Sequence, residues 1–214
     1  MLEFRPSLLA ITLFIITNAC DKKESDLLVK KDEIVAKEEY CEIVSSYPII
    51  YPGNKDTTIN SLNRKLKNIN HLDQSTKYCN RANETRKRIK IQGTYSVLFE
   101  SKNLLCLEYL TTVEGIDVKR FTPLFIDLNE KRITSDRKAF PIPDSRVLVP
   151  YITSFCDSSK IQINLSVYEN NKTFAMSYGI TPDDLILYLG GEGEGFGYHK
   201  LSIPLKELGL STLF

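Results

Sequence analysis

Five cysteines carry the most distinctive chemistry in this chain of 214 residues. Cys20 follows an apolar run, Leu8 to Ile16, and a few small or polar residues. This order resembles a bacterial lipobox, in which the cysteine is lipidated and becomes the new N-terminus. The other four are an even number and permit two disulfides in an oxidising compartment: Cys41, Cys79, Cys106 and Cys156. All three pairings stay open. Their wide spacing, without a C-x-x-C motif, does not favour zinc.

A glycine-rich segment near the C-terminus, 190–197, is the second conspicuous feature. It contains two carboxylates and no following Lys-Ser/Thr, so it does not fit a phosphate-binding loop. A calcium site would need about six to eight oxygen ligands, and only Asp183 and Asp184 lie nearby to add to them. The pattern is typical of a loop between strands, and we expect no metal and no cofactor. If this region binds a ligand or partner, the contact residues are Glu192, Glu194, Phe196, Tyr198 and His199.

Paired carboxylates offer an alternative chemistry, that of an envelope glycan hydrolase. Glu108, Glu114 and Asp117 cluster near the end of a predicted strand, and the two glutamates of the glycine-rich segment could approach them. Nothing in the sequence fixes that geometry. We therefore assign no catalytic residue and favour a non-catalytic protein, with hydrolysis as the alternative.

The first residues predict the subcellular location of the protein. Residues 1–19 have the order of a lipoprotein signal peptide, with Arg5 before the apolar run. That run spans only about 14 Å as a helix, less than half of a bilayer core of about 30 Å. Residues 20–38 alternate in charge and are sparse in apolar residues, which is typical of a solvated tether. We expect a protein anchored to the cell envelope by lipid on Cys20, with plain secretion as the alternative.

The overall charge argues against one class of partner. The chain has 28 Lys and Arg against 27 Asp and Glu, a formal net charge of +1. Binding to nucleic acid needs a clear excess of clustered cations. We expect no nucleic-acid partner; an envelope protein or peptidoglycan remains the expected ligand.

Two stretches have apolar residues at helical spacing. A helix is predicted over 57–70, where four apolar residues recur every three or four positions: Ile59, Leu62, Leu66 and Ile69. A second is predicted over 144–155, although it contains Pro150. The basic stretch Lys77–Lys90 is typical of a solvated helix end or loop.

Strands account for most of the remaining pattern. They are predicted over 40–51, 89–99 with a bulge at Gly93, 104–113, 119–128, 161–167, 174–178, 185–189 and 200–203, with a short return strand at Ile133. The links between the central strands are too short for helical crossovers, which favours antiparallel pairing. We therefore predict an α+β fold: an antiparallel sheet packed by about two helices, in a single domain over 39–214.

Parts of this pattern resemble an extracytoplasmic domain family of bacterial envelope proteins. The resemblance covers most of the mature chain and is carried by Tyr47–Ile50, Ile59–Asn63, Tyr95–Thr112, Phe125–Leu128, Gly179–Ile180, Leu185–Leu189 and Leu201–Leu208. The family includes the sensor region of the lysozyme-responsive anti-sigma factor and the module beside a secreted peptidoglycan deacetylase. One departure is the segment Val113–Asp117, where family members usually carry a Gly-Gly-Ala-His turn. The resemblance implies an envelope binding or sensing domain without established catalysis of its own, and it does not carry lysozyme binding over to this chain.

Overall fold

The structure is a computed structural model. It describes residues 29–37, 39–51, 56–69, 73–114, 118–134, 140, 142–166, 177–190 and 197–210. The predicted signal peptide, Cys20 and most of the glycine-rich segment lie outside these residues. No helix in the described ranges is long and apolar enough to cross a membrane.

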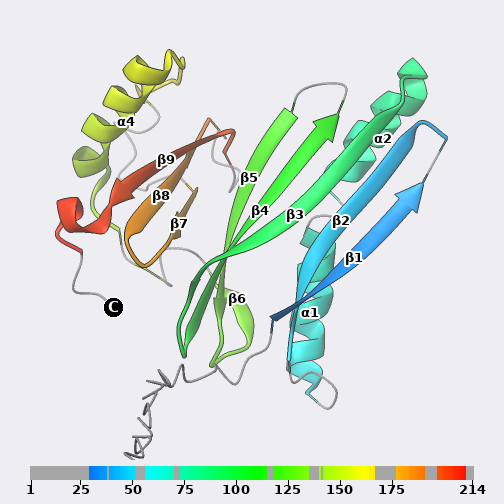
Figure 1. Cartoon of the computed structure of the whole chain (residues 1–214), viewed down its shortest axis with the longest axis horizontal. Coiled ribbons are helices and arrows are strands. Elements are labelled where there is room, and N and C mark those ends of the chain that lie inside the picture. Colours follow the sequence, from blue (N-terminus) through cyan, green and yellow to red (C-terminus); the bar gives the residue numbers. More distant parts are fainter. Residues whose placement is uncertain are drawn as a thin grey trace, which may run out of the picture.

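The described strands form two sheets (Figure 1). The larger sheet has the order β1-β2-β3-β4-β5-β6, formed by β1 (Val29–Lys37), β2 (Cys41–Ile50), β3 (Ile89–Glu100), β4 (Leu104–Glu114), β5 (Val118–Asp127) and β6 (Arg132–Thr134). The smaller has the order β7-β8-β9, formed by β7 (Ser177–Ile180), β8 (Asp184–Leu189) and β9 (His199–Pro204). All neighbours are antiparallel except β2 and β3. A parallel pair needs a long crossover, and here it contains α1 (Thr57–Ile69) and α2 (Asp73–Thr85).

The alternating direction of the side chains along β4 shows how the layers are stacked. Leu105, Leu107 and Tyr109 pack with α1 on one face of the large sheet. Cys106 and Glu108 point to the other face, where the small sheet lies. Two successive residues point to opposite faces of a strand, so β4 contributes to both interfaces.

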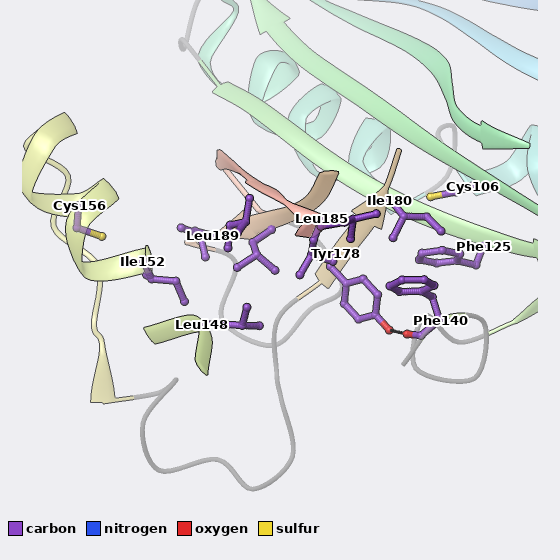
Figure 2. Close-up of a cluster of buried hydrophobic side chains, with 13 residues drawn as sticks. Cys106, Phe125, Phe140, Leu148, Ile152, Cys156, Tyr178, Ile180, Leu185 and Leu189 are labelled. Carbon is purple, nitrogen blue, oxygen red and sulfur yellow. Dashed lines mark hydrogen bonds between the residues drawn. The ribbon is translucent and has the colours of Figure 1, made fainter. Parts of the chain in front are cut away.

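The small sheet is likewise covered on both faces. Leu185, Leu187 and Leu189 of β8 join the core cluster of α4 (Ser145–Ser159), whereas Ile186 and Tyr188 pack with Phe121 of β5. Figure 2 shows α4 contributing Leu148, Ile152 and Cys156 from one end of this cluster. The order of layers is therefore α1 and α2, large sheet, small sheet and α4. A short 3-10 helix, η1 (Leu205–Leu208), follows β9.

Several predicted elements are confirmed. These are the α+β class, the helix at 57–70, the helix starting after Asp144, the strands over 40–51, 89–99, 104–113, 119–128, 185–189 and 200–203, and the return strand at Ile133. Of the predicted strand 174–178, only its end lies in the described residues, where β7 begins at Ser177. The basic stretch forms the end of α2 and the start of β3.

Four details were wrong. Residues 29–37 of the predicted tether form β1, because they pair along their whole length with β2 and Lys37 forms an ion pair with Glu42. Residues 161–166 form no strand, since Ile161 instead donates its N–H to the Cys156 carbonyl at the end of α4. The strands divide into two sheets rather than one. The irregularity in β3 lies between Val97 and Phe99, not at Gly93.

The start of α1 is fixed by Asp56. Its carboxylate accepts hydrogen bonds from the backbone N–H groups of Thr58 (2.9 Å) and Ile59 (3.2 Å), as an N-cap does. The ammonium of Lys131, from the turn between β5 and β6, also donates to it. The Lys131 hydrogen bond and those from the backbone hold the pKa of Asp56 below its ordinary value.

This shift predicts a loss of stability in acid. A carboxyl group with a lowered folded-state pKa stabilises the protein above its unfolded pKa, and that contribution disappears as the pH falls through the folded pKa. We expect Asp56→Asn to be less stable than wild type at about pH 6, and the difference to shrink at about pH 3. Urea unfolding at the two pH values measures it. A difference that does not depend on pH would contradict the role of the charge.

Candidate functional site

The predicted contact surface lies partly outside the described residues. Glu192, Glu194 and Phe196 are among those not described. Tyr198 is 43% exposed, and its backbone N–H donates to the Leu189 carbonyl. His199 is half-buried at the start of β9, which is an edge strand of the small sheet. Tyr198 and His199 therefore both lie beside Leu189, at the end of β8.

The cysteines behave differently from the expectation of two disulfides. Cys41 of β2 and Cys79 of α2 are bonded, and both are buried. Cys106 and Cys156 are buried and not disulfide-bonded, so the prediction of a second disulfide is wrong. Figure 2 shows the physical reason: Cys106 and Cys156 lie at opposite ends of one hydrophobic cluster. Burial, together with the charge of Asp157, raises the pKa of the Cys156 thiol.

Glu108 is the most deeply buried charged group among the described residues. The Tyr188 hydroxyl donates to one of its oxygens at 2.5 Å, and the Lys200 ammonium lies 3.0 Å and 2.8 Å from the two oxygens. Burial first, and then the Glu108 charge and hydrogen bond, raise the pKa of Tyr188, so this phenol stays a hydrogen-bond donor. The three residues come from β4, β8 and β9. They join the two sheets in a fully paired cluster.

This arrangement predicts a stabilising role for Glu108. Glu108→Ala would leave the Tyr188 hydroxyl buried without its acceptor, and we expect a loss of about 2 kcal/mol in the free energy of unfolding. Lys200→Gln should cost less, since the Lys200 side chain is 35% exposed and water can solvate the site. Urea titration measures both. Equal effects, or none for Glu108→Ala, would contradict this account.

The structure describes two members of the predicted carboxylate cluster, Glu108 and Glu114, and these two do not lie together. Glu114 lies six residues further along the same strand, about 20 Å away at about 3.4 Å per residue. Asp117, Glu192 and Glu194 lie outside the described residues. In the described part of the chain, no group of three or more His, Cys, Asp or Glu side chains is arranged to hold a metal ion.

A second set of charges crosses one end of the large sheet. In the strand register, Lys37 of β1 lies opposite Glu42 of β2, Glu42 opposite Lys90 of β3, and Lys90 opposite Glu114 of β4. Residues directly opposite each other in neighbouring strands share a face, so these four form a row of alternating charge. Lys37 and Glu42 are 3.4 Å apart, and Gln92 donates to Glu114 at 3.2 Å.

The charge row lines a hollow of about 470 Å³. The other lining residues include Glu39, Tyr40 and Arg88, beside the disulfide-bonded Cys41. A second hollow, of about 530 Å³, shares Glu39 and Tyr40 and adds Asn83 and Arg86 from the end of α2. We call the two together the disulfide-end hollow. Its lining combines acidic and basic side chains.

Sequence reasoning missed this site apart from Glu114. The available signal was the basic stretch Lys77–Lys90, which supplies Arg86, Arg88 and Lys90. The balanced charge of the chain and the lack of interleaved aromatic residues favour a solvated helix end or loop for that stretch. Its acidic neighbours in the structure come from other strands and are remote in sequence.

No family model matches the sequence, and no curated protein matches it. Among solved structures, the chain is similar to a member of the DUF3298 family from Bacteroides fragilis, with 14% identity over 87% of this chain and 94% of that chain, and a TM-score of 0.45. It is also similar to a DUF3298 family protein from Pseudomonas aeruginosa, with 9% identity over 86% of this chain and 94% of that chain, and a TM-score of 0.46.

Proposed function

We propose that this chain is a bacterial envelope lipoprotein whose folded domain binds a protein or cell-wall ligand without catalysing a reaction. The observation that carries the proposal is the buried disulfide between Cys41 and Cys79. Disulfides persist in oxidising compartments outside the cytoplasm and are rare inside it. The lipobox-like Cys20 and the resemblance to envelope sensor and deacetylase-associated domains point to the same compartment.

The non-catalytic part of the proposal is supported by Glu108. A general acid or base must exchange a proton with a substrate, so it needs access to one. Glu108 is only 7% exposed, and both of its oxygens are engaged by Tyr188 and Lys200. This carboxylate is therefore suited to joining the two sheets.

We assign ligand contact to the surface around Tyr198 and His199, together with Glu192, Glu194 and Phe196 of the glycine-rich segment. Tyr198 is 43% exposed, and aromatic residues are enriched in protein contact surfaces. In co-sedimentation with purified peptidoglycan sacculi, we expect Tyr198→Ser to reduce retention about fivefold. The matched control is Val147→Ser, because Val147 is also an exposed apolar residue but lies on α4, outside the Tyr198 surface. Equal retention of both variants would remove this surface from the proposal.

The proposed location in the cell envelope is tested by the intact mass of the protein purified from its native membrane. We expect the mass of the chain from Cys20 plus acyl groups. In denaturant without reductant, alkylation should modify Cys106 and Cys156, and with reductant it should also modify Cys41 and Cys79. A full-length mass with every cysteine free would place the protein in a reducing compartment and contradict the proposal.

A further inference from the structure

We infer that the disulfide-end hollow binds a short peptide carrying both carboxylate and ammonium groups, such as the stem peptide of peptidoglycan. The inference rests on the proposed function, because it names the ligand class of an envelope domain. It concerns other residues than the Tyr198 surface. The hollow is lined by β1 to β4 of the large sheet and the end of α2, whereas Tyr198 and His199 lie beside the end of β8 in the small sheet.

The charge row determines which kind of ligand the hollow can bind. Lys37, Glu42, Lys90 and Glu114 alternate in sign across four neighbouring strands. Neighbouring strands are about 4.8 Å apart, so positive and negative groups alternate at that interval. A polyanion would be repelled by the two glutamates, and a polycation by the two lysines. A ligand that carries both charges meets complementary groups at Lys90 and Glu114, beside the Lys37–Glu42 ion pair.

The rim adds cations that are available to a ligand. Arg86 and Arg88 are exposed, and neither forms an ion pair with an acid in the described part of the chain. A guanidinium binds a carboxylate through two parallel hydrogen bonds, which makes arginine well suited to a peptide carboxylate. Glu39, on the wall shared by both hollows, offers an acceptor for an ammonium group.

The walls of the hollow are held in place. The Cys41–Cys79 bond joins β2 to α2, and the residues beside Cys41 and at the end of α2 line the two parts of the hollow. Half-buried Tyr40 belongs to both parts and provides an aromatic face. A site that is already rigid loses less entropy when it binds. Volumes of about 470 and 530 Å³ fall in the range of small-molecule sites and suit a peptide of a few residues.

The test is calorimetric titration of the mature chain, purified in detergent, with the synthetic tripeptide L-alanyl-γ-D-glutamyl-meso-diaminopimelate. We expect Arg88→Ser to weaken binding about tenfold or more, because one charge-assisted pair is lost. Arg64→Ser removes an exposed arginine from α1, away from the hollow, and should leave the affinity unchanged. Thermal unfolding of each variant shows that it is folded. The same tripeptide with amidated carboxyl groups should also bind about tenfold more weakly.

Three results would overturn the inference: no binding of the tripeptide, equal affinity of Arg88→Ser and wild type, or equal affinity for the amidated peptide. Tighter binding of inorganic polyphosphate than of the tripeptide would show instead a site for polyanions. Any of these results would contradict the inference about the hollow alone. The proposed function would still hold if the intact mass shows acyl groups on the chain and the protein is retained on sacculi. The proposed function itself fails on the mass measurement, whatever the tripeptide does.

Discussion

Removal of the Cys41–Cys79 disulfide is expected to lower the free energy of unfolding by about 4 kcal/mol. The bond closes a loop of 38 residues, and the chain-entropy relation gives about this value for a loop of that length. The loop contains α1 and connects β2 to α2. Cys41→Ala/Cys79→Ala, which avoids a new buried hydroxyl, should show the loss in guanidinium titration.

The same change should have a local effect on α2. This helix is polar, and its buried residues in the described range are only Cys79 and Ala82, with Tyr78 half-buried. Without the disulfide, little apolar area holds α2 on the sheet. Hydrogen exchange should therefore accelerate in α2 and remain slow in α1, which buries Ile59, Leu62 and Leu66.

Reduction of the wild-type protein provides the control. Dithiothreitol should lower the stability of wild type to that of the double variant and should leave the variant unchanged. A loss below about 1 kcal/mol, or a dithiothreitol effect on the variant, would contradict a stabilising disulfide at this position.

Gly197→Ala should be nearly as damaging, with an expected loss of about 3 kcal/mol. A Cβ atom at Gly197 would clash with the carbonyl carbon of Tyr188 and would lie 2.6 Å from the backbone nitrogen of Leu189. Both contacts are with backbone, which cannot rotate away as a side chain can. Gly197 also exchanges two hydrogen bonds with Phe121 of β5, at 2.8 and 3.0 Å. The added methyl group would therefore separate the small sheet from the edge of the large one.

Gly209→Ala is the matched control for this prediction. A Cβ atom there meets no atom within 4 Å, and only its φ of +69° opposes a side chain. We expect a cost of about 1 kcal/mol from that backbone conformation. Urea unfolding midpoints compare the two variants. If Gly197→Ala is no less stable than Gly209→Ala, close packing at Gly197 is not what holds the sheets together.

The elements that could be predicted are those whose signal is local. The apolar spacing of α1 and the long strand of β4 are set by consecutive residues, so their positions followed from the sequence. β1 was missed because its alternating charges are also typical of a solvated segment. Its stability as an edge strand comes from pairing with β2, and the backbone partners of a strand are not encoded in its own residues.

The candidate site was harder to predict for the same reason. Each member of the charge row is an ordinary charged residue in its own strand, and only the register between four strands places them opposite one another. The cysteines show an intermediate case. Their even number indicated disulfide bonding, but whether Cys106 and Cys156 meet depends on how α4 packs, which has no local signal.

The early start of β1 limits how far the protein can reach from a membrane. If Cys20 is the lipid anchor, as proposed, only nine residue steps connect it to Val29, at most about 32 Å of extended chain. β1 then runs about 27 Å to Lys37, beside the disulfide-end hollow. The hollow therefore lies no more than about 60 Å from the bilayer surface along this path, even when the chain is fully stretched. Any ligand that occupies it must come within that distance of the membrane.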